Sequence, residues 1–253
     1  MGKIKFGLNM GPVQADFVKN PVDVLRELSQ IGYEGVEIGY PLPLPVGEFN
    51  SLAKELDMVP ISVHARRPSN DDELKQHIDF AKSVHCERIV LGSGRPDKLQ
   101  SADDYKTLAE LFNKCGEQCK KVAIQVFYHN HHYEFIKHVG KYGMDIFIEE
   151  TNPEWVNLEL DVGWLKVGGV DPVEYIHKNE SRCRLIHFKD VKIKGNGYDF
   201  TEAGTGDVDF KKIHDIANPQ IVDWLISEQD SSTLPPMECV KVNYENFKRL
   251  GVT

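Results

Sequence analysis

The sequence predicts an α/β protein whose single domain, residues 1–253, is a (β/α)8 barrel. Short apolar or β-branched segments alternate with amphipathic segments along the whole chain, a pattern typical of parallel strands covered by helices. The 253 residues contain eight such pairs, the number of strand–helix units in a closed (β/α)8 barrel of this length. No linker, low-complexity segment or internal repeat beyond this alternation divides the chain.

The apolar segments predict eight strands: Ile4–Leu8, Gly35–Ile38, Val59–Val63, Arg88–Leu91, Val122–Tyr128, Val156–Leu160, Arg184–Phe188 and Ile221–Ser227. The amphipathic segments predict eight helices: Pro21–Ile31, Glu48–Leu56, Asp71–Val84, Asp103–Lys121, Lys137–Glu150, Asp171–Lys178, Asp207–Ile216 and Glu238–Leu250.

Local signals support these boundaries. Asn20-Pro21 and Asp171-Pro172 place a capping residue before a proline at the first helical position. Gly32 and Gly251 stand where helices should end. An open, doubly wound sheet is the alternative fold, but the glycines of Gly7-Leu-Asn-Met-Gly11 have the wrong spacing for a dinucleotide-binding turn.

Two connections differ from ordinary short turns. Tyr40–Gly47 is rich in proline and follows the second strand, whereas Lys192–Gly206 is long, polar and rich in glycine and follows the seventh. Segments that follow barrel strands form the active site, so Lys192–Gly206 is expected either as a mobile lid or as a plain surface loop.

Composition excludes several classes of function. The formal net charge of −9 disfavours a nucleic-acid partner, and no apolar run approaches the roughly 20 residues of a membrane span. The N-terminal segment is too short in apolar length for a signal peptide, and the five scattered cysteines do not resemble a disulfide framework. We therefore expect a cytoplasmic protein with a small-molecule partner, and the sequence leaves a homo-oligomer open.

Ionisable residues stand at the carboxyl ends of successive predicted strands. The fifth strand runs into His129, Asn130, His131, His132 and Glu134, an unusual density of imidazoles and carboxylates. Comparable residues end other strands: Glu37, His64 with Arg66, Asp161 with Trp164, His187 with Lys189, and Glu228 with Asp230. These ends converge at one mouth of a barrel, and mixed nitrogen and oxygen donors suit Mn²⁺, Mg²⁺, Co²⁺ or Zn²⁺.

Each of these residues also has a structural interpretation when it is taken alone. Asp161 could cap the following helix, His187 could be a hydrogen-bonded core imidazole, and Glu228 could pair with Arg66. Their occurrence on consecutive strands favours a metal site over a structural polar cluster. Cys115 and Cys119, four residues apart, are better explained as two thiols on one helix face than as metal ligands.

Several motifs, which together span nearly the whole chain, resemble those of a known superfamily. They are Gly32–Ile38 (GYEGVEI), Tyr128–Phe135 (YHNHHYEF), Leu160–Trp164 (LDVGW) with Gly169–Pro172, Ile186–Asp190 (IHFKD), Gly204–Phe210 (GTGDVDF) and Ser227–Asp230 (SEQD). The chain resembles the xylose-isomerase-like TIM barrels, the sugar phosphate isomerase/epimerase superfamily. That superfamily also contains inosose dehydratases, tagatose/psicose 3-epimerases and endonuclease IV.

The resemblance implies one divalent ion, with Mn²⁺ expected, held by residues from strands five to eight. Asp161, His187 and Glu228 match the aspartate, histidine and glutamate of the family. In strand five, His129 stands where many relatives carry the glutamate of Glu-Asn-His. Glu134 is therefore assigned as the fourth ligand, with His129 or His131 as the alternative.

The resemblance does not extend to DNA repair. Endonuclease IV binds three zinc ions with additional histidines, whereas Trp164 occupies the position three residues after Asp161 here. The negative net charge also disfavours a DNA substrate.

The resemblance and the donor set predict a divalent-metal-dependent sugar isomerase or epimerase that works through an enediolate. Glu134 or Glu228 would abstract the proton next to the carbonyl. Lys189 shares a strand face with His187 and would neutralise the enediolate oxygen or act as an acid, unless it is a surface lysine. A lyase, dehydratase or keto-glycoside-cleaving enzyme shares this first step and is the alternative. A non-catalytic sugar-binding barrel is the alternative of another class.

Further residues at the mouth are expected to bind a sugar or keto-sugar. His64 and Arg66 would hold distal hydroxyls or an anionic group, and Trp164 and Phe127 would offer apolar surface. The remaining expected contacts come from Glu37, His129 and His131. No glycine-rich helix start follows strand eight, so a phosphate group on the substrate is not required.

Overall fold

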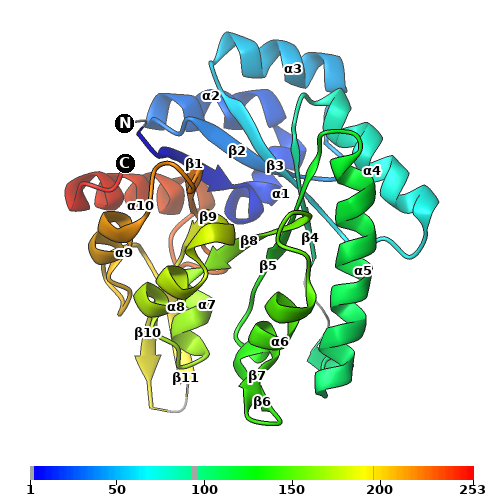
Figure 1. Ribbon diagram of the computed structural model, residues 1–253. Helices are drawn as coiled ribbons and strands as arrows, with labels where there is room; N and C mark the ends of the chain where they lie inside the picture. Colours follow the sequence, from blue (N-terminus) through cyan, green and yellow to red (C-terminus); the bar gives the residue numbers. More distant parts are fainter. Residues whose placement is uncertain (1–2, 93–95, 196) are drawn as a thin grey trace.

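The computed structural model describes residues 3–92, 96–195 and 197–253, and within them eight parallel strands close into a barrel (Figure 1). The order around the barrel is β1-β12-β9-β8-β5-β4-β3-β2. The strands are β1 Lys5–Asn9, β2 Gly35–Gly39, β3 Val59–Ala65, β4 Arg88–Leu91, β5 Gln125–His129, β8 Val156–Asp161, β9 Cys183–Phe188 and β12 Trp224–Ser227. The predicted fold class is confirmed.

Helices surround the barrel and connect consecutive strands, as Figure 1 shows. They are α1 Gln14–Lys19, α2 Pro21–Ile31, α3 Val46–Glu55, α4 Asp71–Ser83, α5 Ala102–Lys120, α6 Gly143–Glu150, α7 Val162–Val167, α8 Pro172–Lys178, α9 Phe210–Ile216 and α10 Pro236–Leu250. Short 3-10 turns lie at Gly11–Val13, Pro96–Lys98, Tyr133–Phe135 (η3) and Glu180–Arg182.

Several elements differ from the prediction; for example, the last strand begins at Trp224 rather than Ile221, and helix α9 begins at Phe210 rather than Asp207. Strand β5 begins at Gln125 rather than Val122, because Ala123 adopts a left-handed φ of 60° in a turn. Residues 137–142, predicted as the start of a helix, form the hairpin strands β6 (Lys137–His138) and β7 (Lys141–Tyr142). The short helices α1 and α7 were not predicted, since they are too short to show a periodic pattern.

The amino-terminal part of the barrel interior is filled by apolar side chains. They come from six positions: Ile61, Val90, Phe127, Leu185, Trp224 and Ile226. Gly35 allows this packing, because a Cβ there would lie 2.6 Å from the Val59 carbonyl oxygen and 2.9 Å from the Trp224 ring. The expectation that Phe127 offers apolar surface to a sugar is wrong, because its fully buried ring belongs to this packed layer.

Towards the carboxyl ends of the strands, the buried positions become polar. Side chains along a barrel strand point alternately into and out of the barrel, so an inward-pointing residue at position i is followed by the next one at position i+2. Glu159 and Asp161 follow this rule on β8, and His187 and Lys189 follow it at the end of β9. All four side chains are fully buried.

The predicted loop Lys192–Gly206 is partly regular. Strands β10 (Asp190–Lys194) and β11 (Gly197–Thr201) pair as an antiparallel hairpin, while Asn196 lies outside the described residues. The buried carboxylate of Asp190 accepts four backbone N–H bonds, from Val191, Gly204, Gly206 and Val208, at 2.8–3.2 Å. This single side chain therefore fastens the segment that follows the hairpin to the end of β9.

The cysteines are buried and form no disulfide: Cys86, Cys115, Cys119, Cys183 and Cys239. Cys115 and Cys119 lie on the buried face of α5, as their spacing predicts. In the part of the chain that the structure describes, no helix has both the length and the apolar character needed to cross a bilayer.

We predict that Asp190→Ala destabilises the protein by about 3 kcal/mol, because four backbone N–H groups lose a charged acceptor. Chemical denaturation measures the loss, and limited proteolysis should show faster cleavage between residues 192 and 206. Asp199→Ala is the control, since Asp199 is an exposed residue of the same hairpin paired with Lys194. Its effect should stay below about 0.5 kcal/mol. Equal effects of the two substitutions would contradict the anchoring role of Asp190.

Candidate active site

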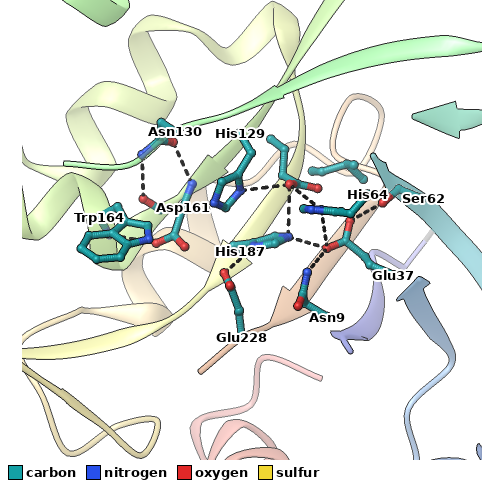
Figure 2. Close-up of polar contacts among 12 residues, drawn as sticks. Asn9, Glu37, Ser62, His64, His129, Asn130, Asp161, Trp164, His187 and Glu228 are labelled. Carbon is teal, nitrogen blue, oxygen red and sulfur yellow. Dashed lines mark hydrogen bonds and ion pairs between the residues drawn. The ribbon is translucent and has the colours of Figure 1, made fainter. Parts of the chain in front are cut away.

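The polar part of the barrel interior has two layers, and the inner layer lies next to the apolar packing. Figure 2 shows Glu37, His64, His129 and His187 pointing toward one another there. Glu37 Oε2 lies 2.6 Å from His187 Nε2 and 3.3 Å from His64 Nε2. Glu159 Oε2 lies 3.0 Å from His129 Nδ1, 3.2 Å from His64 Nε2 and 3.3 Å from His187 Nε2. Two carboxylates thus share three imidazoles.

The inner layer is also fixed by neutral polar groups. Ser62 donates to Glu37 Oε1 at 2.6 Å, and the Asn9 amide donates to Glu37 Oε2 at 3.2 Å. Because these partners come from β1 and β3, the carboxylate of Glu37 on β2 is held from both neighbouring strands.

The outer layer lies nearer the mouth and contains a buried lysine. Lys189 Nζ lies 2.9 Å from Asp161 Oδ2, 3.1 Å from Glu228 Oε2 and 2.5 Å from Asp230 Oδ2. Glu228 Oε2 also lies 2.7 Å from His187 Nδ1. The imidazole of His187 therefore connects the two layers, with one ring nitrogen facing each.

Local structure explains how the strand ends hold these groups. The amide of Asn130 pairs with the backbone of Asp161 in both directions, so it extends the contact between β5 and β8 beyond their last residues. Asp161 Oδ1 caps α7 by accepting from the Trp164 N–H at 2.8 Å (Figure 2). Oδ2 is thereby left for Lys189. Both interpretations of Asp161, helix cap and site carboxylate, are therefore compatible.

Mutual electrostatics decides the ionisation of these groups. Burial opposes the charged form of Glu159, but the neighbouring imidazoles of His187 and His64 outweigh it and hold its pKa well below the usual range. Burial likewise disfavours a charged His187, yet Glu159, Glu37 and Glu228 raise its pKa well above the ordinary value. Burial raises the pKa of Asp161 to about 6 against the opposing effect of Lys189.

The donor atoms fit a divalent cation. Two groups of four side chains place one donor atom each within 4.8 Å of one another: Glu37, His64, Glu159 and His187, and His129, Asp161, His187 and Glu228. Imidazole nitrogens and carboxylate oxygens are the ligands of Zn²⁺, Mn²⁺ and related ions. Within the described residues, Glu159 Oε1 has no hydrogen-bond partner, although it is buried. An oxygen in this state is suited to a cation.

A family model described as xylose isomerase-like TIM barrel matches residues 25–241. The chain belongs to this family. Among curated members, an inosose dehydratase from Clostridium tetani is 25% identical, in an alignment that covers 85% of this chain and 84% of the relative.

Solved xylose isomerase-like barrels share the fold. A sugar phosphate isomerase/epimerase from Parabacteroides distasonis superposes with a TM-score of 0.83 at 22% identity, covering 98% of this chain and 94% of the other. The IOLI protein, solved with a zinc atom, superposes with a TM-score of 0.78 at 13% identity, with 98% of each chain covered.

Glu134, expected from the sequence as a metal ligand and base, lies apart from both donor groups. Its buried carboxylate accepts from the Tyr128 hydroxyl at 2.8 Å and from the His131 N–H at 2.9 Å. The ring of Tyr128 packs on Phe112 and Phe147 of the surrounding helices, so Glu134 lies beside the outer face of β5. It shapes the turn that carries His131.

Other expected sugar-binding residues take different positions. Arg66 is exposed and its guanidinium pairs with Glu73 at the start of α4, 3.0 Å away. Trp164 and His131 lie against each other, and Trp164 also contacts Tyr198 and Phe200 of β11. These rings form an aromatic wall next to Lys189, whose Nζ lies 4.8 Å from the centre of the Trp164 ring.

Two carboxylates of the site had no role assigned from the sequence, namely Glu159 and Asp230. The signal for Glu159 was present, because it precedes Asp161 by two residues and must point to the same side of β8. Asp230 likewise follows Glu228 by two residues, just beyond the end of β12, so the same spacing pointed to it.

We predict a pH-dependent stability effect of Glu134. Burial raises its pKa from 4.5 to about 7, so between these values the folded protein keeps a proton that the unfolded chain has lost. Stability therefore falls as pH rises from 4.5 to 7, by about 3 kcal/mol in total. Glu134→Gln should lack this decrease.

Urea denaturation at pH 5 and pH 8 tests the prediction. The difference in unfolding free energy between the wild type and Glu134→Gln should shift in favour of the variant at pH 8. Glu110→Gln, on the exposed side of α5, should follow the wild type at both pH values. A difference that is independent of pH would show that Glu134 is ionised in the folded protein.

Proposed function

We propose that this protein is a divalent-metal-dependent lyase that dehydrates a polyhydroxy ketone. The observation that carries the proposal is the pair formed by buried Lys189 and partly exposed Glu228, 3.1 Å apart, in which Glu228 also belongs to a donor set for a divalent ion. Loss of water next to a carbonyl needs a base for the C–H proton and an acid for the departing hydroxyl. A carboxylate and an ammonium group side by side meet both needs.

The similarity to inosose dehydratases supports this choice, because it extends over most of both chains. An inosose is a cyclic polyhydroxy ketone, and a substrate of this chemical class has both the acidic C–H and the β-hydroxyl that elimination requires. The aromatic wall around Trp164 would pack against the C–H face of such a ring.

His129, Asp161, His187 and Glu228 would hold the ion in this proposal. Glu134 is not included, because its carboxylate is occupied by Tyr128 and the His131 N–H. When bound, the divalent ion would polarise the substrate carbonyl and make the neighbouring C–H proton more acidic.

The side chains of the chain perform the proton transfers. Glu228, 14% exposed, is a more accessible carboxylate than the fully buried Asp161 and takes the proton at Oε2. Lys189 Nζ is charged, because Asp161, Glu228 and Asp230 outweigh the effect of burial and raise its pKa. It donates a proton to the leaving hydroxyl and is oriented by Asp161 and Asp230.

An isomerase or epimerase is the second candidate, supported by the fold similarity to a sugar phosphate isomerase/epimerase. The same base would remove the same proton, and Lys189 would stabilise the resulting oxyanion instead of releasing water. The two candidates differ only in the fate of the carbanion after the first proton transfer.

Incubation in D₂O with a ketocyclitol and a panel of ketoses, with Mn²⁺ or with a chelator, tests the proposal. The expected result is metal-dependent loss of one water, seen by mass spectrometry as a product about 18 Da lighter. Deuterium incorporation without a mass loss would favour the isomerase or epimerase. If no compound of the panel shows metal-dependent C–H exchange or water loss, a sugar-binding barrel is the better interpretation.

We predict that Lys189→Met lowers kcat by about 10²–10⁴-fold, because the general acid is lost while the apolar length of the side chain is kept. Lys192→Met is the matched control, since Lys192 lies three residues further along the chain, on β10, and pairs with Asp207. Steady-state kinetics on the substrate found in the panel measures both. Equal kcat values for the two variants would remove Lys189 from the reaction.

A further inference from the structure

We propose that a second divalent cation binds in the inner layer, held by Glu37, His64 and Glu159 next to Nε2 of His187. This inner site lies one layer deeper than the outer ion of the proposed function. The inference rests on the proposed function only in assuming that the outer ion is present. The second ion would make the centre binuclear, with the His187 ring between the two ions.

Three of the distances between inner donor atoms match the spacing of a coordination shell. Ligands about 2.0–2.1 Å from a tetrahedral ion lie about 3.3 Å from one another. The distances from His64 Nε2 to Glu37 Oε2 and Glu159 Oε2 are 3.3 and 3.2 Å, and that from His187 Nε2 to Glu159 Oε2 is 3.3 Å. Glu37 Oε2 and His187 Nε2, only 2.6 Å apart, would have to separate by about 0.7 Å to accommodate an ion.

The charges of the two layers support an ion in each. The outer layer contains three carboxylates, Asp161, Glu228 and Asp230, and its only ammonium group among the described residues is Lys189. One divalent ion would bring the positive charge to three and balance them. Glu37 and Glu159 face the imidazoles of His64, His129 and His187, and since an imidazole that binds a metal ion is neutral, the two buried carboxylates would need another positive charge. A second divalent ion supplies it.

One further feature of Glu159 indicates a missing partner. Its side chain is fully buried, and Oε1 has no hydrogen bond to any residue that the structure describes. Glu37, by contrast, has both oxygens engaged, by Ser62 and by Asn9 and His187. A buried carboxylate oxygen without a donor is costly unless a cation is bound nearby.

The inner ion would have two consequences for the outer layer. It would fix the ring of His187, whose Nδ1 lies 2.7 Å from Glu228 Oε2, and thereby orient the proposed base. It would also add positive charge close to the outer layer, where negative charge would develop during proton removal in the proposed reaction.

Metal content of the full chain tests the inference without any substrate. Protein stripped with chelator, reloaded with Co²⁺ and desalted should contain two ions per chain by elemental analysis. Glu159→Gln and Glu37→Gln should each retain one ion, and Asp161→Asn should also retain one. The absorption spectrum of Co²⁺ should differ between these variants, because the remaining ion sits among different ligands.

Glu134→Gln is the matched control, as it replaces a buried glutamate outside both donor groups and should retain two ions. Circular dichroism and thermal melting identify any variant that fails to fold, and His64→Ala provides a second inner-layer test. One ion in the wild type, lost in Asp161→Asn but kept in Glu159→Gln and His64→Ala, would overturn the second site alone. If the wild type holds one ion, and this ion is lost in Glu159→Gln and His64→Ala but kept in Asp161→Asn, the binuclear centre and the outer ion of the proposed function are both overturned. Two ions in Glu159→Gln would also overturn the inference.

Discussion

Compensation of buried charge is the constraint on which this site depends. The barrel interior encloses the carboxylates of Glu37, Glu159 and Asp161, and each would be costly there without a positive partner. Lys189 and the imidazoles of His64, His129 and His187 supply partners from other strands. Because the charges come from strands far apart in sequence, only the closed barrel brings them into balance. The charge balance of the site therefore depends on the closed fold.

The fold could be predicted from the sequence because it depends on regular repetition. Alternation of apolar strands and amphipathic helices is sufficient for the closed parallel sheet, and the start of helix α2 follows directly from Asn20-Pro21. The hairpins β6–β7 and β10–β11 were missed because each is short and carries little apolar patterning. The segment after β11 is held by long-range contacts of Asp190, which no local pattern reveals.

The site was predictable where strand geometry alone decides the direction of a side chain. Lys189 was placed beside His187 by the two-residue repeat, and the structure brings both to the same centre. Glu159 was missed although the same repeat links it to Asp161. Glu134 lies beyond the end of β5, where a 3-10 turn sets its direction, so its contact with Tyr128 could not be read from spacing. Strand geometry fixes where these donor atoms meet, whereas the choice of ligands among them depends on the ion.

The anchoring of the β10–β11 hairpin has a consequence for how this barrel could diversify. Asp190 fixes the base of the hairpin directly after Lys189, while Tyr198 and Phe200 extend from β11 to Trp164. Substitution or lengthening near the hairpin tip would reshape the aromatic wall without displacing the lysine. Evolution or engineering could thus change the size of the accepted substrate independently of the chemistry. Under the proposed function, the hairpin would be a separable module for selectivity beside an unchanged reaction centre.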